Sequence, residues 1–509
     1  MKTRIYLALT LTVCLLSACE KYVNIKRNSV ETLLSSAKDC QSLLDDYSTM
    51  NTDYTSDMEI SSDDYFLTNN SYSTNGDIGQ DEKDLYAWLP SAIHTGDGGW
   101  TKLYYIVYRA NLVLETVEKL KDNESDQNLL NNLRGSALFF RAFAFWNIAQ
   151  MYAKPYSATA NSDLGIPLRL SSDINDKSVR GTVADTYNRI VTDLQEAVSL
   201  LQPTSLKASR PNKAGAHAML ARVYLSMDDY VNALPNATSA IQLAAKNDVK
   251  QLDSKLLDYN LLDKSSETPF KRFNGEVIFH AISGSTAILY PGSADSPVAR
   301  IKEELSNLYE VNDLRKQIFF KPNTISFIYP TPTPSNPTAT ATATVPDGTY
   351  RFTGNYEETA GSDQFIGLAV DEVYLIRAES YARSGNVSSA MNDLNTLLRS
   401  RWDNTVTYPV MTASTADEAL NKVLNERRKE LVMRRQRWTE LRRLNKESRF
   451  AKTITREVKQ FNATGTSPTN YTVTSSVITS FSLPPNDLRY VLLIPQNVIT
   501  QSGIAQNPR

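Results

Sequence analysis

The chain has 509 residues, of which 41% are hydrophobic, and this is ample material for a buried core. Its formal net charge of −2 excludes the strongly basic surface that nucleic-acid-binding proteins use. Only three histidines are present, His94, His217 and His280, and they lie far apart in the sequence. Histidine-based catalysis or metal binding is therefore disfavoured.

The first nineteen residues have the form of a secretory leader. Two basic residues precede an apolar run from Ile5 to Leu16, and Leu16-Ser17-Ala18-Cys19 closes it. Such a run is typical of a signal peptide and is too short to span a bilayer. The triplet before Cys19 resembles a bacterial lipoprotein cleavage box, so we expect residues 1–18 to be removed and Cys19 to be acylated. The alternative is an ordinary secreted protein in which Cys19 is incidental.

Cys40 is the one cysteine that we expect to stay unmodified, because Cys14 leaves with the leader and Cys19 receives lipid. Without a partner it forms neither an intramolecular disulfide nor a cysteine metal site. We expect a small packed residue beside the start of a helix near residues 41–44. The sequence predicts no metal and no cofactor.

Helical periodicity runs through much of the chain. Three amphipathic helices are predicted in the first half, at Trp100–Leu120, Leu129–Tyr152 and Thr182–Leu201. Thr182 and Asp185 resemble a capping pair at the start of the third helix. The segment before these helices, Asp45–Gly99, is poorly periodic and rich in Ser, Asn, Asp and Tyr.

A helix-pair motif occurs twice. Ala216–Leu243 and Val373–Arg399 both place Ala, Tyr and Leu at the spacings of a tetratricopeptide helix pair. In such pairs small residues let two helices approach closely. The corresponding residues Tyr224 and Tyr381 are far apart in the chain, so a long segment is inserted between the two copies.

The inserted segment differs in character from the helices. Lys271–Tyr290 contains strand-like runs such as Glu276–Phe279. Tyr329–Pro346 is rich in Pro and Thr, which excludes a core helix and predicts an exposed extended loop. Irregular loops on a helical scaffold commonly carry binding residues.

Ala416–Lys446 is predicted as one long charged helix, with Leu424, Leu431 and Trp438 on its buried face. Many arginines lie between these positions: Arg427, Arg428, Arg434, Arg435, Arg437, Arg442 and Arg443. Such a run alone would suggest phosphate contacts. In an exported chain with interleaved glutamates, we expect surface ion pairs and arginine stems that cover apolar surface instead. No nucleic-acid partner is expected.

Ordered motifs along the chain resemble one known family. After the lipoprotein box they are Trp100-x-x-x-Tyr104, Arg134-Gly135-x-Ala137, Asp163-x-Gly165-Ile166-Pro167, Glu372-x-Tyr374-Leu375, Glu426-Arg427-Arg428-x-Glu430-Leu431, Arg437-Trp438-x-x-Leu441-Arg442-Arg443 and Ile494-Pro495-Gln496-Asn497. In this order they resemble the SusD/RagB family of outer-membrane nutrient-binding lipoproteins, over essentially the whole mature chain. Two departures occur: Arg509 follows Pro508 where the family often has Gly, and Arg434-Arg435 replaces a Gly-Glu-like pair.

The resemblance implies a mostly α fold, in which a tetratricopeptide-like scaffold of helical hairpins carries long irregular loop insertions and a few short strands. We expect a leader at 1–18, an N-terminal scaffold with ligand-facing loops at 19–270, and a C-terminal region at 271–509. The resemblance also implies a lipid-anchored protein, exposed at the surface of the outer membrane, that captures a nutrient without breaking its bonds. The implied ligand is an oligosaccharide, and the implied partner is a SusC-like TonB-dependent outer-membrane barrel.

Sugar binding requires aromatic surfaces and polar side chains that bond hydroxyl groups. The irregular segments supply both. The segment Ser61–Trp100 contains Tyr65, Phe66, Tyr72, Tyr86, Trp88 and His94 among Asp63, Asp64, Asn69, Asn70 and Asn75, and the inserted segment contains Tyr290, Phe319, Phe320, Tyr329, Tyr350 and Tyr356. From this pool the predicted ligand contacts are Asp63, Asp64, Tyr65, Tyr72, His94, Tyr290 and Tyr329.

Three alternatives stay open at this point. An exported glycoside hydrolase would need two carboxylates about 5–9.5 Å apart, and Asp63-Asp64 and Asp371-Glu372 are the candidates. Adjacent acids point in different directions on a regular element, and no Gly-x-Ser-x-Gly or phosphate-binding glycine loop is present. The other two alternatives are a binder of peptides or another nutrient, and a tetratricopeptide adaptor that binds only protein.

Overall fold

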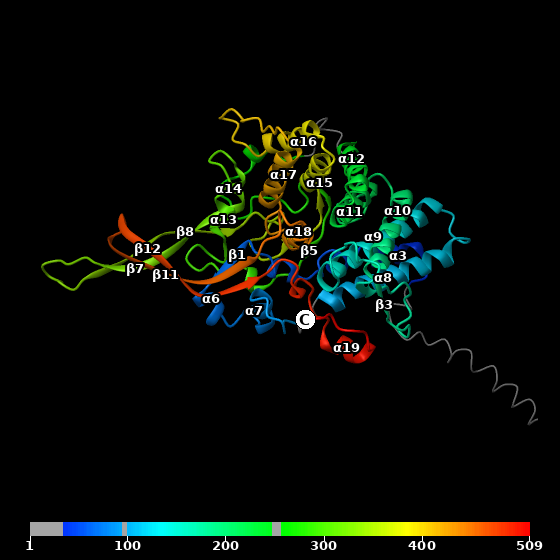
Figure 1. Cartoon of the computed structure of the whole chain (residues 1–509), viewed down its shortest axis with the longest axis horizontal. Helices are drawn as coiled ribbons and strands as arrows, with labels where there is room; N and C mark the ends of the chain where they lie inside the picture. Colours follow the sequence, from blue (N-terminus) through cyan, green and yellow to red (C-terminus); the bar gives the residue numbers. More distant parts are fainter. Residues whose placement is uncertain (1–33, 94–98, 247–255) are drawn as a thin grey trace, which may run out of the picture.

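The computed structural model describes residues 34–93, 99–246 and 256–509, and helices dominate it. The predicted leader, Cys19 and His94 lie outside these ranges. No helix among the described residues is long and apolar enough to cross a membrane. The mostly α fold expected from the sequence is confirmed (Figure 1).

The helices predicted in the first half are present with nearly the expected bounds. They are α8 (Gly99–Leu120), α9 (Gln127–Tyr152) and α10 (Val183–Leu200), and each packs against the next. The predicted cap of α10 is confirmed, because the Thr182 side chain accepts from the Asp185 N–H and the Asp185 carboxylate accepts from the Thr182 N–H. Short helices precede them: α3 (Ala37–Leu44), α4 (Tyr47–Met50), α5 (Asp57–Ile60), α6 (Asn69–Ser73) and α7 (Gln80–Tyr86). Cys40 is fully buried on α3, as predicted.

Both predicted helix pairs are present and stand next to each other. The first is α11 (Lys213–Ser226) with α12 (Tyr230–Lys246), and the second is α15 (Val370–Arg383) with α16 (Val387–Arg399). Helix α12 packs against α15, so the chain leaves the scaffold after the first pair and returns beside it (Figure 1).

The prediction of one helix over Ala416–Lys446 is wrong. The segment forms α17 (Ala416–Glu430) and α18 (Gln436–Leu444), separated by a turn. Met433 and Arg435 in this turn have positive φ angles of 56° and 61°, and left-handed backbone interrupts a helix.

The expectation that the arginines of this segment lie on the surface is also wrong. Arg427, Arg434, Arg435, Arg442 and Arg443 are buried, because α17 and α18 are covered by the helix pairs and by N-terminal segments. A buried charge is costly unless it is paired. Arg443 accordingly bonds Glu379 at 2.6 and 2.9 Å, and Arg434 bonds Asp371 at 2.7 Å.

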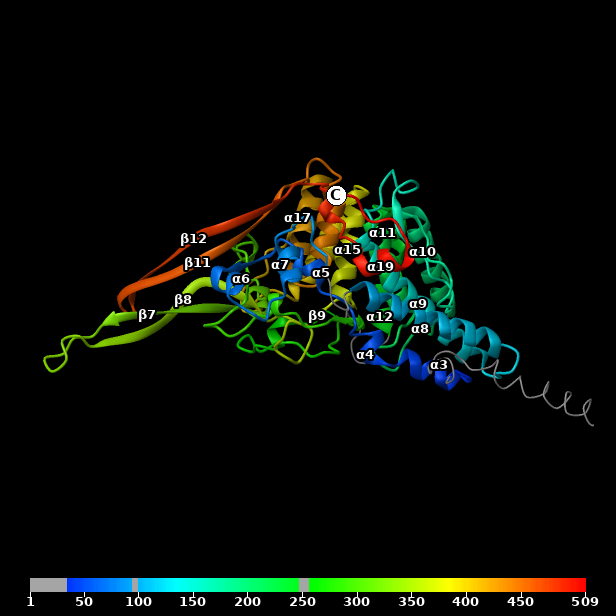
Figure 2. The same cartoon turned by 90° about the horizontal axis from the view of Figure 1, so that it is seen from below.

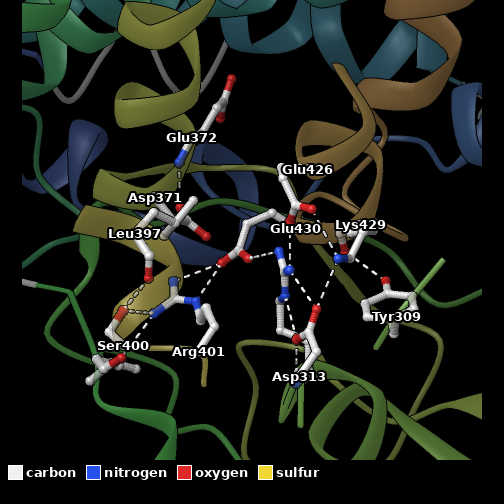
Figure 3. Close-up of polar contacts among 12 residues, drawn as sticks. Tyr309, Asp313, Asp371, Glu372, Leu397, Ser400, Arg401, Glu426, Lys429 and Glu430 are labelled. Carbon is white, nitrogen blue, oxygen red and sulfur yellow. Dashed lines mark hydrogen bonds and ion pairs between the residues drawn. The ribbon is translucent and has the colours of Figure 1, made fainter. Parts of the chain in front are cut away.

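Glu430 is the centre of one such interior network (Figure 3). Its carboxylate accepts from Arg401 at 2.7 and 2.8 Å and from Arg315 at 3.0 Å. Arg315 also donates to Asp313 and Glu426, so the network joins α17 to the inserted segment. The Glu-Arg-Arg-x-Glu motif of the sequence therefore holds the scaffold together.

The largest sheet has the strand order β12-β11-β1-β6-β8-β7. Its strands are β1 (Tyr65–Thr68), β6 (Ala299–Ile301), β7 (Phe320–Pro330), β8 (Thr340–Phe352), β11 (Ile454–Ser467) and β12 (Asn470–Leu483). The predicted loop at Tyr329–Pro346 instead forms the ends of β7 and β8 and the turn between them. Extended Thr- and Pro-rich backbone is compatible with this hairpin because Thr favours strands.

The far end of the β11–β12 hairpin reaches the β7–β8 hairpin, whose turn extends beyond this contact (Figure 2). The ring of Phe327 in β7 lies 6.2 Å from the ring of Tyr471 in β12, and Ala343 and Val345 are buried beneath them. The hairpins thus form a projection with a small apolar core of its own.

The remaining elements are short. Three two-stranded ladders join β2 (Leu164–Pro167) to β3 (Arg180–Thr182), β4 (Val277–Phe279) to β10 (Leu368–Ala369), and β5 (Ile282–Ser283) to β9 (Gln364–Phe365). The strand predicted at Glu276–Phe279 is therefore confirmed. Helices α13 (Glu303–Ser306), α14 (Arg315–Phe319) and α19 (Gln496–Ser502), with the 3₁₀ helices η1 (Tyr259–Leu261), η2 (Ala287–Leu289) and η3 (Leu488–Tyr490), complete the described elements.

The main hydrophobic core includes side chains from both halves of the sequence. Phe139, Phe140 and Phe143 of α9 surround Phe279 of β4, with ring centroids 4.7 to 5.7 Å apart. The boundary expected at residue 270 stays a prediction, and residues on its two sides share this core.

Candidate ligand-binding groove

A groove of about 390 Å³ opens where α6, the loop at 295–298 and strands β1, β6, β7 and β11 meet. We call it the α6 groove. Its volume lies within the range of about 300–1,000 Å³ that is usual for small-molecule sites. Its lining residues are Thr68, Asn70, Ser71, Thr74, Asn75, Asp295, Ser296, Pro297, Val298, Arg300, Ile325, Gln460 and Phe461.

The rim of the groove is set by the start and end of α6. Thr68 ends β1 and caps the helix, since its hydroxyl accepts from the Ser71 N–H at 3.1 Å. The Thr74 hydroxyl then donates to the Asn70 carbonyl at 2.7 Å at the other end of the helix. These two capping bonds hold Asn70 and Asn75 at the rim.

Arg300 and Phe461 meet beneath the rim. The Arg300 guanidinium lies over the Phe461 ring, with its carbon 4.8 Å from the ring centroid. It also bonds the buried Asp347 carboxylate, and it donates to the Thr349 hydroxyl at 2.7 Å. Asp347 balances the charge of Arg300. The other charged residue of the lining is Asp295, which lies at the exposed rim. Most of the groove is thus lined by hydroxyl, amide and apolar groups.

The carboxylate pairs proposed for hydrolysis lie elsewhere. Asp371 bonds Arg434 at 2.7 Å, and Glu372 accepts from Arg222 at 2.9 Å. Both acids are buried, and neither lines the α6 groove. Burial raises the pKa of Asp371 to about 7 although Arg434 lowers it. Among the described residues no cluster of three or more His, Cys, Asp or Glu side chains could hold a metal ion.

Comparison with known proteins identifies the family. A family model described as "Starch-binding associating with outer membrane" matches residues 21–225, and the SusD family model matches residues 330–509. The chain belongs to the SusD/RagB family. SusD-like protein P2 of Formosa agariphila is 26% identical over 375 residues, which are 68% of this chain and 71% of that protein.

Solved structures of SusD-like proteins share this fold. A SusD superfamily protein from Bacteroides thetaiotaomicron is 21% identical with a TM-score of 0.66, covering 93% of this chain and 100% of its own. A laminarin-binding SusD-like protein is 17% identical with a TM-score of 0.60, covering 93% of this chain and 98% of its own. At these identities the likeness concerns the fold.

Three predicted contacts of this SusD/RagB chain are buried in the structure. Asp63 bonds Arg437 at 2.6 Å, Asp64 bonds Arg428 at 2.7 Å, and the Tyr65 hydroxyl donates to the Ile60 carbonyl at 2.9 Å. Burial favours a protonated Asp63, yet Arg437 holds the pKa of this carboxyl well below its usual value. Their exposed fractions are 2%, 1% and 0%, so we correct the prediction that they present themselves to a ligand.

The predicted tyrosines occupy three separate places. Tyr72 lies on α6, but its half-buried ring packs toward Tyr86 and Phe481, with centroids 5.7 and 6.1 Å away. Tyr290 is 46% exposed, and its carbonyl accepts from the Ala299 N–H at 3.1 Å, on the segment that leads to the groove. Tyr329 lies near the far end of β7, and its ring centroid is 6.0 Å from that of Phe327. The structure does not bring the three rings together.

Three residues of the groove lining, Arg300, Gln460 and Phe461, were not predicted from the sequence. The apolar residues Ile454, Val458 and Phe461 are spaced four and three apart, so this stretch lacks the strict alternation that marks a half-buried strand. No local pattern shows that β11 runs parallel to β1, from a distant part of the chain, and completes the groove. Asn70 and Asn75, from the predicted pool of loop side chains, do line it.

Proposed function

We propose that this SusD/RagB protein is a non-catalytic, lipid-anchored binding protein of the outer-membrane surface. It captures an oligosaccharide in the α6 groove and passes it to a SusC-like TonB-dependent barrel. The observation that carries the proposal is a groove of suitable size, lined mostly by uncharged polar groups, whose lining includes the half-buried Phe461 together with Asn70, Asn75 and Gln460.

The chemistry of the lining suits a sugar. Aromatic carbon packs against the C–H faces of a pyranose, and amide and hydroxyl side chains both donate and accept hydrogen bonds. Asn70, Asn75 and Gln460 supply amides, and Thr68, Ser71 and Ser296 supply hydroxyls. The description of the matching family model as starch-binding, and the laminarin-binding neighbour of the same fold, support a glycan as the ligand.

The anchor and the partner belong to the same proposal. The lipoprotein box at Leu16–Cys19 supports acylation of Cys19, which would keep the groove at the membrane surface. Labelled palmitate should appear in the wild-type protein in the native host and be absent from Cys19→Ser. Copurification with a barrel protein from solubilised outer membranes tests the partner.

Binding without turnover is favoured over hydrolysis because the adjacent acid pairs are buried with arginine partners. Asp63 and Asp64 bond Arg437 and Arg428, and neither acid lines the groove. A general acid and a nucleophile must both reach the scissile bond.

Calorimetric titration of the purified full-length chain with neutral and acidic oligosaccharides tests the function. Phe461→Ala should weaken binding about tenfold, or about 1.4 kcal/mol. Val477→Ala is the matched control, since Val477 is 51% exposed on β12 and lies outside the groove lining. Affinity for peptides alone, or release of shorter sugars during incubation, would replace this proposal with one of the alternatives.

A further inference from the structure

A second groove, of about 450 Å³, lies beside the first. We call it the β8 groove, because residues 347–350 of β8 form one of its sides. Phe66, Lys459 and Ser475 also line it. Phe461 lines both grooves, so the two concavities meet at this one ring.

The strand register places the residues that connect the two grooves on one face of the sheet. Phe66 of β1 pairs with Arg300 of β6, and Thr68 of β1 pairs with Lys459 of β11. Paired residues, and alternate residues of one strand, project from the same face. Phe66, Thr68, Arg300, Lys459 and Phe461 therefore share a face.

The grooves are also close together along β1. Thr68 lines the α6 groove and Phe66 lines the β8 groove, and two residues of a strand span about 7 Å. Side chains of the two grooves also contact one another. The ring of Phe66 stacks on that of Phe461, with centroids 6.2 Å apart, and the Lys459 ammonium lies 5.2 Å from the centroid of the Phe66 ring. A chain-like ligand can thus pass from one groove to the other over Phe461 without crossing the sheet.

The charges of the second groove are largely paired with one another and offer no excess of cations to an anionic ligand. Its lining contains four acids, Glu303, Glu304, Asp347 and Glu457, and two lysines, Lys302 and Lys459. Lys459 is paired with Glu457 at 3.1 Å, and Arg300 is bonded to Asp347. Glu304 bonds Arg428 at 2.7 Å, so three of the four acids have cation partners, and the lining carries no excess of positive charge that would attract sulfate or uronate groups.

We propose that the ligand is an uncharged linear oligosaccharide, long enough to occupy the α6 groove and the β8 groove together across Phe461. This inference rests on the proposed glycan-binding function and adds the charge and the minimum length of the glycan. It follows from the shared face, the shared ring and the charge-paired lining.

Three serine variants separate the grooves. Ser296→Trp fills the α6 groove and Ser475→Trp fills the β8 groove, and both serines are exposed. Ser476→Trp is the matched control, because Ser476 is exposed on β12 but points to the opposite side from Ser475. Each full-length variant is titrated with disaccharides and hexasaccharides of laminarin, xylan and mannan, which are neutral, and of alginate, which is anionic.

We expect a neutral hexasaccharide to bind at least about tenfold more tightly than its disaccharide. Ser475→Trp should abolish this advantage and leave the disaccharide affinity unchanged, whereas Ser296→Trp should weaken both and Ser476→Trp neither. Equal affinities for the two lengths, an unaffected hexasaccharide in Ser475→Trp, or a preference for alginate would overturn the inference while leaving glycan binding intact. Absence of binding to all the probes would instead overturn the proposed function.

Discussion

The Arg300 guanidinium is held between two partners, the ring of Phe461 and the carboxylate of Asp347. The Asp347 side chain is fully buried, so the arginine both neutralises this carboxylate and supports the ring that the two grooves share. The stability of the sheet and the shape of the binding surface therefore depend on the same side chain.

Replacing this arginine should destabilise the protein. Arg300→Ala leaves Asp347 buried without its charge partner, which typically costs about 3–5 kcal/mol of unfolding free energy. Urea denaturation measures this loss. Adding Asp347→Asn should recover part of it because a neutral amide is less costly to bury. A double variant as unstable as Arg300→Ala would contradict the role given to the ion pair.

The buried ion pair of Arg443 and Glu379 should contribute far more to the unfolding free energy than an exposed ion pair does. Both side chains are buried and share two hydrogen bonds, so Arg443→Ala should lower the unfolding free energy by about 3–5 kcal/mol. Lys121→Ala is the control, since Lys121 bonds Glu118 at 2.5 Å at an exposed site. We expect no measurable change there, and equal effects of the two substitutions would be inconsistent with the buried arrangement.

Glu59 should make stability depend on pH. Its burial raises the pKa from 4.5 to about 7, while its carboxylate accepts from the Ser62 hydroxyl and the Arg435 N–H at 2.8 and 2.7 Å. The folded protein then holds this proton more tightly than the unfolded chain does. The contribution of Glu59 to unfolding free energy therefore falls as pH rises from about 4.5 to about 7, by roughly 3 kcal/mol.

The test is the difference between wild type and Glu59→Gln in denaturant unfolding at several pH values. The variant should gain stability relative to wild type as pH rises through this window. Glu358→Gln, at an exposed position, should run parallel to wild type. A constant difference between Glu59→Gln and wild type would show that Glu59 does not titrate there.

Phe327→Ala should loosen the hairpins without unfolding the scaffold. The ring contacts Tyr471 at the far end of the sheet, in an apolar cluster separate from the main core. Loss of a buried aromatic ring typically costs about 3–5 kcal/mol. Here we expect this cost to lower the free energy of local opening of the hairpins and not that of global unfolding. Hydrogen exchange should accelerate in β7 and β12 and stay unchanged in α9. Faster exchange in α9 as well would mean that the two cores unfold together.

Local patterns were sufficient to predict the scaffold from sequence. Helices α8 to α12, α15 and α16 follow from apolar periodicity, and the Thr182 cap follows from a motif of four residues. The break between α17 and α18 depends on left-handed backbone at Met433 and Arg435, two residue types that give no local sign of it. Asp63 was predicted to contact the ligand but is buried, because it forms an ion pair with Arg437 from a distant part of the chain, and no local pattern reveals such a pair.

The groove itself was less predictable. Its sides come from residues near 70, 300, 325 and 460, which only the tertiary fold brings together. The periodicity of one strand cannot reveal its neighbours in a sheet, and the pairing of β1 with β11 joins segments almost four hundred residues apart.

The contact between α12 and α15 has a consequence for how such a protein diversifies. Because the chain departs and re-enters at neighbouring points of the frame, exposed parts of the segment between them, such as the turn between β7 and β8, can be lengthened, shortened or exchanged without displacing either hairpin, whereas its buried residues Phe279 and Arg315 cannot. Selection can then remodel cargo preference through these exposed parts, while the paired charges of the interior keep the frame in register.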